Sequence, residues 1–569
     1  MSLLDWTVLF LTLAGISFYG IYRGRKSKGL DAYLRAGQSL PWYHVGLSVM
    51  ATQASAITFL AGPGFGYAHG LGFIQFYLGL PLAVLVLCIS FVPNFYRLNV
   101  YTAYEYLESR FDSKTRTLTA LLFLILRALS TAISVYAPSL ILSALLHIPS
   151  YSSTLLVGLL VITYTLIGGS KAVSYTQVLQ MIIIFSGLFT AIGITLGLLP
   201  KNVHLGQALE ISGMMGHLKA INFHWDLKDR YTIWSGLMGG FFLQLSYFGT
   251  DQSQVSRYLT GSSIRESKMG LIMNGLVKIP MQFLILMTGV LVFTFYQFHE
   301  PPIAFNPLIK SGIRSNGSLQ KFTGLEKEYH STFLSKKENI ERYLDNQNKD
   351  PSSNRDGIKK EIQGQYQNMV VLEKKAQSLK DIQTQKSSDD SNYVFLSFIL
   401  KYLPHGLIGA LMAIIFLSSM GAVSSALNSM ASTSLVDFYR RWFDPGREEA
   451  FYLFLSKGFT LFWGLVCIFL ALFIGEFDNL IEAVNIIGSF VYGPILGVFL
   501  VAFYFKWIKG NAVFYGGILG EIMVLIASRY LNIAYLWLNV VGSISVVFIA
   551  LILESTIFRP RIPIQIKNP

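Results

Sequence analysis

Apolar stretches as long as a membrane-crossing helix recur along almost the whole chain. We count about thirteen of them, near residues 4–21, 42–66, 72–96, 117–147, 150–168, 172–199, 232–256, 269–297, 394–438, 450–474, 478–505, 510–529 and 534–556. A helix of about 20 apolar residues spans the hydrocarbon core of a bilayer and satisfies its own backbone hydrogen bonds there. The chain is therefore predicted to be an all-α polytopic membrane protein with about thirteen transmembrane helices.

The charge distribution supports this class and orients the chain. A net charge of +13 would suggest nucleic acid in a soluble protein, but this chain is 52% hydrophobic and its basic residues fall in short loops. The basic residues concentrate in every second loop between the apolar stretches; the first such loop contains Arg23, Arg25, Lys26 and Lys28. The positive-inside rule then predicts an outside N-terminus and a cytosolic C-terminus. We expect a plasma membrane of bacterial type, with lipid and no nucleic acid as partner. We expect the first stretch to be retained, since Asp5 stands where a signal peptide is basic.

Signals of enzyme chemistry are sparse. The two cysteines, Cys88 and Cys467, both lie in apolar stretches, so neither a disulfide framework nor a CxxC metal site is expected. HxxxH, a phosphate loop and a nucleophile elbow are all missing from the sequence. We expect no enzyme and no cofactor.

One long polar interval divides the apolar pattern. Residues 306–392 contain Lys/Glu-rich stretches at Glu326–Leu344 and Ile358–Ile382, with apolar residues at helical spacing and a turn sequence at 350–354 between them. We expect a polar helical hairpin outside the membrane, acting as a cap, as a partner-docking arm, or as a solvated insertion with no direct functional role. The predicted segments are transmembrane helices one to eight (1–305), the extracytoplasmic insertion (306–392), transmembrane helices nine to thirteen (393–556) and a short cytosolic tail (557–569).

Two apolar stretches contain helix-breaking residues at the depth of the membrane. The second carries ATQASAITF at Ala51–Phe59 followed by Gly62-Pro63-Gly64, and the seventh carries Gly239-Gly240 followed by polar residues up to Asp251. If the first stretch is an additional helix, these two are the first and sixth of ten core helices. Interrupted helices at matching positions of two halves are typical of transporters with an inverted repeat. Close helix packing by Gly and Pro is the alternative.

A single lysine interrupts the eighth apolar stretch. Lys278 lies about ten residues into it, which places the ammonium roughly 15 Å deep. A charge at this depth predicts a functional site, unless it pairs with a buried acid or carbonyl for structural reasons.

Five motifs, in order along the chain, resemble those of the sodium/solute symporter family. They are Ser55–Tyr67, Val100–Phe111 (VYTAYEYLESRF), Tyr164–Gln180 (YTLIGGSKAVSYTQVLQ), Gln252–Tyr258 (QSQVSRY) and Leu427–Tyr439 (LNSMASTSLVDFY). The family includes sodium-coupled carriers of sugars, proline, sialic acid and iodide. The resemblance implies a five-plus-five inverted-repeat core with discontinuous first and sixth core helices. It also implies secondary active transport by alternating access, coupled to sodium.

The same resemblance implies cation ligands, and here the chain departs from the family pattern. A central sodium site would use the carbonyls of Ala51, Ala54 and Ser418, but its two hydroxyl positions fall on Gly421 and Ala422. A second site of some members would use Ser424 and Ser425, but its carboxylate position is Gln177.

Sodium needs nearly all of its water replaced by oxygen ligands, as other hard cations do. We therefore expect degenerate sodium sites. A shifted sodium site, proton coupling through Lys278, Asp251 or Glu521, and transport without an ion stay open.

Resemblance to the sugar carriers implies the solute-binding residues. They are Gln53, Ser55, Thr58, Gln244, Lys278 and Asn485, with Tyr247 as an aromatic gate. These hydrogen-bonding groups with one cation favour a small polar or anionic organic solute. Tyr77 stands where some sugar carriers have an acid, which weakens a sugar assignment. A transporter-like membrane sensor that works through a separate partner is the alternative function, and the oligomeric state is unknown.

Overall fold

The structure is a computed structural model that describes residues 1–24, 29–146, 148–201, 203–306, 319–349, 355–379, 390–443, 446–474 and 479–558. The turn expected at 350–354 and almost all of the expected cytosolic tail lie outside the described residues. Within them the chain is helical, and no strand is present beyond one isolated bridge between Leu40 and Gly261. The prediction of an all-α protein is confirmed.

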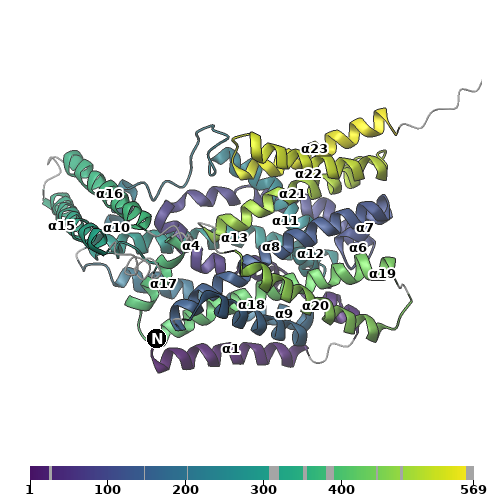
Figure 1. The fold of residues 1–569 in the computed structure, drawn as a ribbon, viewed down its shortest axis with the longest axis horizontal. Coiled ribbons are helices and arrows are strands. Elements are labelled where there is room, and N and C mark those ends of the chain that lie inside the picture. Colours follow the sequence, from purple (N-terminus) through teal and green to yellow (C-terminus); the bar gives the residue numbers. More distant parts are fainter. Residues whose placement is uncertain are drawn as a thin grey trace, which may run out of the picture.

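Figure 1 shows the helices with their labels. The α-helices are α1 (Leu3–Gly24), α2 (Leu30–Arg35), α3 (Trp42–Gln53), α4 (Ala56–His69), α5 (Leu80–Val86), α6 (Val92–Arg97), α7 (Ala103–Arg110), α8 (Ser113–Leu146), α9 (Ser150–Gly197), α10 (Leu205–Met214), α11 (Gly240–Thr250), α12 (Gln252–Tyr258), α13 (Ile264–Phe298), α15 (Leu319–Lys349), α16 (Arg355–Ser378), α17 (Ser391–Tyr402), α18 (Leu407–Thr433), α19 (Arg440–Trp442), α20 (Glu449–Ala471), α21 (Leu480–Tyr504), α22 (Gly510–Tyr530) and α23 (Tyr535–Thr556). The shorter helical turns are η1 (Ala36–Gln38), η2 (Gly70–Tyr77), η3 (Leu87–Phe91), η4 (Ser235–Gly239) and η6 (Ser434–Tyr439).

Eleven helical stretches of the described residues are long and apolar enough to cross a membrane. One of them, Ala56–Arg97, runs from α4 through η2 to α6, and the η4–α11 segment is not among the eleven. The expected thirteen helices are reached only if Ala56–Arg97 is divided in two and the η4–α11 segment is added. The exact count of thirteen therefore stays a prediction.

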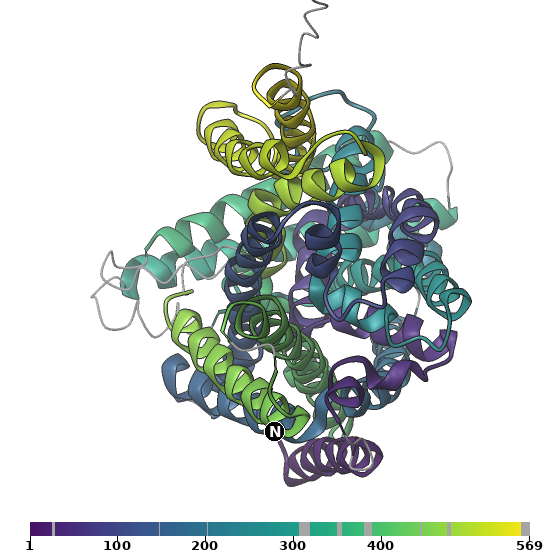
Figure 2. The same cartoon turned by 90° about the vertical axis from the view of Figure 1, so that its right-hand side faces the viewer.

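The long helices lie side by side along the longest axis of the molecule (Figure 1). Helix α1 lies at the periphery against α9 and α18, and on the opposite side α22 and α23 form an outer layer over α21 (Figure 2). Helices α3, α4, α8, α13 and α18 lie between these layers. Polar side chains of these helices, such as Ser48, Lys278 and Ser425, are buried.

Both expected interruptions are present, but they lie at different residues from the strongest helix breakers. Helix α3 ends at Gln53, Ala54 and Ser55 are non-helical, and α4 then runs without a break through Pro63. The second break is at Asp251, between α11 and α12, rather than at Gly239-Gly240. Discontinuous first and sixth core helices are thus confirmed.

The glycines near Pro63 serve close packing. A Cβ added at Gly289 would overlap the carbonyl oxygen of Pro63, and one at Gly64 would overlap the carbonyl oxygen of Ser391. Without side chains at these positions, α13 and α17 approach the backbone of α4 closely, as small residues allow in membrane proteins.

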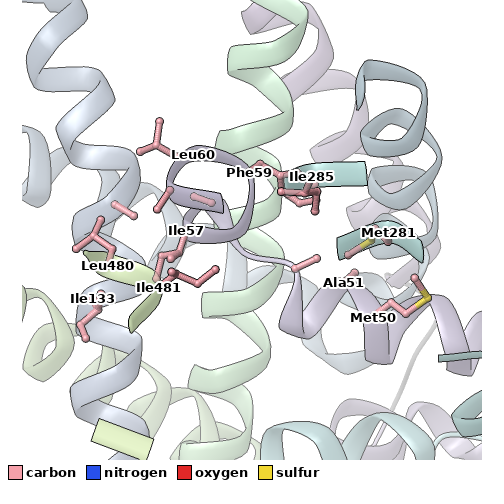
Figure 3. Packing of buried hydrophobic residues seen from close by; sticks show 14 of the residues in the cluster. Met50, Ala51, Ile57, Phe59, Leu60, Ile133, Met281, Ile285, Leu480 and Ile481 are labelled. Carbon is pink, nitrogen blue, oxygen red and sulfur yellow. The ribbon is translucent and has the colours of Figure 1, made fainter. Parts of the chain in front are cut away.

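Apolar contacts hold both halves of the first broken helix against α13, and the second half also contacts α21. Figure 3 shows Met50 and Ala51 of α3 beside Met281 of α13, whereas Ile57 of α4 lies beside Leu480 and Ile481 of α21. All of these side chains are buried. Because packing fixes both halves, the non-helical residues between them can present backbone groups to the interior.

The polar hairpin is docked on α10 and on the end of α13. Helices α15 and α16 pack against each other around Tyr329, Phe333 and Leu372. Lys336 Nζ donates to Gln297 Oε1 at 2.8 Å, and Tyr343 Oη donates to Glu210 at 2.6 Å. The expected pair of helices is present within 306–392, while the limits of the four segments stay a prediction.

We expect the docking of α16 to weaken as pH rises, because the Glu373 carboxyl of α16 is held between the two helices of the hairpin by Tyr329 of α15. Tyr329 Oη donates to Glu373 at 2.8 Å, and burial raises the pKa of the Glu373 carboxyl from 4.5 to about 7. A pKa raised in the folded state gives stability that is complete below the unfolded pKa and is lost as pH rises through the folded one. Between pH 5 and pH 8 the loss amounts to about 2 kcal/mol.

Hydrogen exchange of α16 amides at pH 5 and pH 8, corrected for intrinsic rates, measures this loss. Glu373→Gln should remove most of the pH dependence, since a neutral amide does not titrate. The matched control is Glu341→Gln on the exposed face of α15, which should leave it intact. Equal pH dependence in wild type and Glu373→Gln would contradict the prediction.

Candidate functional site

A cavity of about 100 Å³ lies between the two helix breaks. It is lined from the first broken helix, from η2, and from α8, α11, α18 and α21. Its polar lining consists of Thr52, Gln53, Ser55, Thr58, Tyr77, Arg127, Ser130, Thr131, Ser134, Tyr247, Asn485 and Tyr492. Hydroxyls, amides and phenols together with one guanidinium suit a solute that is small and polar.

The structure brings together five of the seven residues that the sequence predicts for the solute. Those that line the cavity are Gln53, Ser55, Thr58, Tyr247 and Asn485.

The other two, Gln244 and Lys278, are buried but lie outside the lining. Lys278 Nζ lies 5.8 Å from the centre of the Tyr77 ring, and Tyr77 itself lines the cavity. Among the described residues the Lys278 ammonium has no hydrogen-bond partner. Its role in solute binding stays a prediction.

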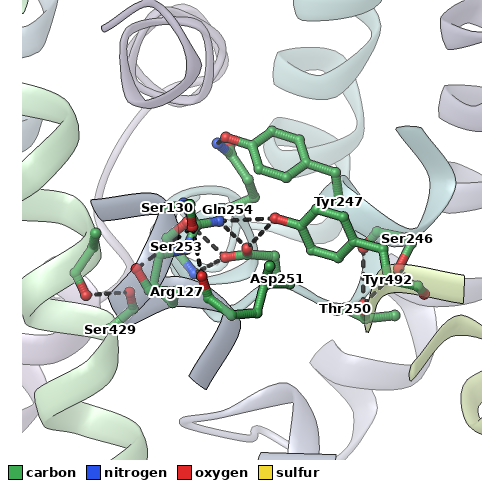
Figure 4. A network of polar contacts seen from close by, with 12 residues as sticks. Arg127, Ser130, Ser246, Tyr247, Thr250, Asp251, Ser253, Gln254, Ser429 and Tyr492 are labelled. Atoms are coloured by element: carbon green, nitrogen blue, oxygen red, sulfur yellow. Dashed lines mark hydrogen bonds and ion pairs between the residues drawn. The ribbon is translucent and has the colours of Figure 1, made fainter. Parts of the chain in front are cut away.

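The charged side chain in the cavity wall is Arg127 of α8, which the sequence reading missed. One Nη of Arg127 pairs with the Asp251 carboxylate and lies 3.2 Å from Tyr492 Oη, which donates to the same carboxylate at 2.8 Å (Figure 4). The buried Arg127 Nε has no partner among the described residues. Arg127 lies inside the fourth apolar stretch, and a charge at that depth indicates a functional site, as it does for Lys278.

Asp251 connects the second break to this cavity. As the N-cap of α12 it accepts hydrogen bonds from Ser253 N at 2.8 Å and Ser253 Oγ at 2.6 Å (Figure 4). The capped end of a half-helix and the Arg127 guanidinium thus share one carboxylate. Nearby, Gln254 Nε2 donates to Tyr247 Oη at 2.6 Å, which holds one wall of the cavity (Figure 4).

The residues expected to bind a cation lie at the first break and on α18. Ser55 N donates to Gln53 O at 3.0 Å, so Ala51 loses the partner that its carbonyl would have in a continuous helix. Ser418 Oγ donates to Ile415 O at 2.8 Å and Ser424 Oγ is buried without a described partner. Ser425 Oγ lies 3.0 Å from Gln177 Nε2, and Ala422 lines the cavity. These placements leave the cation ligands a prediction.

Gln180 is a further polar residue that the sequence reading did not single out. Its Oε1 is buried without a described partner, and it lies 2.5 Å from the place where a side chain at Gly421 would begin. An amide oxygen therefore occupies the space next to the glycine that stands at one expected hydroxyl position.

The chain is similar in sequence and in fold to known transporters. The sequence model of the sodium:solute symporter family matches residues 33–314 and 373–520. The chain is 28% identical over 531 residues to the sodium-dependent multivitamin transporter of Oryctolagus cuniculus, over 92% of this chain and 70% of that protein. It is 26% identical over 573 residues to the sodium/sialic acid symporter SiaT of Proteus mirabilis, over 98% of this chain and 96% of that protein. A Na⁺-coupled sialic acid symporter solved in a substrate-bound, outward-open state has the same fold, with a TM-score of 0.74 at 23% identity over 97% of this chain and 98% of that one.

Proposed function

Since the chain belongs to the sodium:solute symporter family, we propose that it carries a small anionic organic solute across the membrane by alternating access, coupled to sodium. Membership makes it an integral membrane protein and a secondary transporter, not an enzyme. The observation that carries the finer proposal is the cavity between two helix breaks with Arg127 in its wall. Backbone breaks at membrane depth persist where they line such a cavity.

The solute is proposed to be an anion because of the groups that face it. Arg127 lines the cavity, its guanidinium can donate to a carboxylate, and charge-assisted hydrogen bonds of this kind are stronger than neutral ones. Hydroxyls of Thr58, Ser130 and Thr131 in the same wall can bind further polar groups.

On the other walls, Gln53, Ser55 and Asn485 are proposed to donate and accept hydrogen bonds, with Tyr247 covering the solute. Lys278 would join them only if the Tyr77 ring moved aside.

The coupled cation is proposed to bind at the first break. The carbonyl oxygens of Ala51, Ala54 and Ser418 would supply part of its shell. The amide oxygen of Gln180, close to Gly421, offers an uncharged oxygen where the family's hydroxyl is missing. Oxygen ligands of this kind are those that hard cations take. We also propose an outside N-terminus, from the basic loops, in a plasma membrane of bacterial type.

Uptake into proteoliposomes tests this function. A panel of labelled carboxylates, including sialic acid and monocarboxylates, is offered with an inward sodium gradient, with a proton gradient, and with neither. We expect at least one carboxylate to accumulate about tenfold above the level without a gradient when sodium is imposed, since a gradient moves the solute against its own concentration. Accumulation with protons alone would identify the other coupling ion. Binding without flux would identify a sensor, and either result would contradict the proposal.

A further inference from the structure

A ring of buried oxygens surrounds one amide nitrogen between α3, α9 and α18. Gln177 Nε2 of α9 lies 3.1 Å from Thr52 Oγ1, 3.0 Å from Ser425 Oγ and 3.3 Å from the carbonyl oxygen of Gly421. Gln177 and Ser425 are completely buried, and Thr52 is nearly so. Three oxygens from two other helices therefore converge on a single donor group.

The surrounding hydrogen bonds fix which end of the Gln177 amide faces the ring. Thr52 Oγ1 donates its proton to Ser48 O at 2.8 Å, so its lone pairs face Gln177. The Gly421 carbonyl can only accept. On the other side, Ser48 Oγ donates to Gln177 Oε1 at 2.5 Å. The NH₂ group must therefore point into the ring.

Oxygens converging from different elements on a positive centre are what a small hard cation requires. Here that centre is the partial positive charge of an amide, and the ring itself contains two hydroxyls and one carbonyl but no carboxylate. An ion at this point would have to displace the NH₂ group and would bring a full charge that the ring does not balance.

We propose that the Gln177 amide is a tethered substitute for a cation, so that this chain takes up no ion inside the ring formed by Thr52, Ser425 and the Gly421 carbonyl. Residue 177 then sets the ion requirement at this point. The inference deepens the proposed function, since it leaves the first break as the place where a coupled ion acts. Because the amide is covalently part of α9, it cannot leave with the solute, and in this structure it ties α9 to α3 and α18.

Gln177→Glu tests the substitution, because it keeps the size of the side chain and supplies the missing negative charge. Purified wild type and variant are melted in detergent at pH 7 and pH 9, in NaCl and in choline chloride of equal concentration. The quantity compared is the melting temperature in NaCl minus that in choline chloride. We expect this difference to exceed the wild-type value by about 5 °C in Gln177→Glu, as a newly bound ion stabilises the folded state.

Two controls make the result specific. Gln282→Glu makes the same change at another buried glutamine, on α13, and should keep the wild-type difference. Gln177→Glu combined with Ser425→Ala should lose the gain, because one oxygen of the ring is gone. If Gln177→Glu does not fold, Gln177→Asp carries the test.

No sodium-dependent gain at either pH, or an equal gain in Gln282→Glu, would overturn the inference. The measurement needs no flux. If uptake in proteoliposomes fails but the melting result is positive, the proposed function is rejected and the role of Gln177 stands. If uptake succeeds but Gln177→Glu shows no sodium-dependent gain, the role of Gln177 is rejected and the proposed function stands.

Discussion

Arg127→Gln is expected to lower the uptake of an anionic solute about a hundredfold, because the solute carboxylate loses its charged partner. Removing one partner of a buried, hydrogen-bonded charge pair costs about 2–5 kcal/mol. Arg127 lines the cavity with its Nε unpartnered among the described residues, while one Nη pairs with Asp251. The substitution removes the positive charge for the solute and leaves the Asp251 carboxylate with Tyr492 and Ser253 as its hydrogen-bond donors. Uptake of the labelled carboxylate in proteoliposomes measures the effect.

The loss of transport has to be separated from loss of structure. Arg127→Gln combined with Asp251→Asn restores neutrality at the pair, so we expect the melting temperature to return toward wild type while uptake stays low. Lys278→Met removes a buried cation that lies outside the cavity lining, and it tests whether Lys278 takes part while the Tyr77 ring stays in place. Its expected effect on uptake is less than about threefold. Full uptake by the double variant would show that Arg127 serves structure and not the solute.

Arg127 and Lys278 also show what a sequence pattern can and cannot predict. Each is a basic residue inside an apolar stretch, so depth in the membrane marks both as candidates. Their difference is tertiary. Arg127 meets Asp251, which is 124 positions away, whereas Lys278 lies by the ring of Tyr77. No local pattern carries that information.

The helices and their interruptions were predictable for a physical reason. Lipid forces each backbone group to be satisfied within the protein, so apolar length predicts a helix, and polar residues at depth predict a break. The position of the break was harder to predict. Pro63 is accommodated inside α4, while the chain departs from helix at Ala54 and Ser55, and this position depends on the packing of both halves against α13.

Gln177 is an intermediate case. The resemblance to the family made the missing carboxylate visible in the sequence. That the amide turns its nitrogen into a ring of oxygens from α3 and α18 depends on three helices that meet only in the folded protein. The docking of the hairpin through Lys336 and Tyr343 is of the same kind, since periodicity predicts its two helices but not their partners.

Arg116→Met is expected to destabilise the protein by about 3–5 kcal/mol, because it leaves a buried carboxylate without its cation. Helices α7 and α19 lie at the end of the molecule away from the hairpin (Figure 1). Arg116 Nε of α8 donates to Asp437 Oδ1 at 2.7 Å, and Arg116 Nη2 donates to Val436 O at 2.9 Å. Asp437 of η6 is completely buried and also accepts from Thr102 at 2.8 Å. The pair joins α7, α8 and η6 across more than 300 positions of sequence, so its loss should affect the whole fold. Denaturant unfolding of the purified protein in detergent measures the change.

Arg441→Met supplies the control for this prediction. Arg441 Nε donates to Glu108 at 2.6 Å, but its side chain is 44% exposed, so this pair should contribute less than about 1 kcal/mol. Replacing both members of the buried pair, Arg116→Met with Asp437→Leu, should recover most of the loss, because no unpaired charge is left in the interior. Recovery would show that the cost of Arg116→Met is the desolvation of Asp437. If Arg116→Met lowers the free energy of unfolding no more than Arg441→Met does, the prediction is wrong. Water would then reach Asp437, and this end of the molecule would open without breaking a buried ion pair.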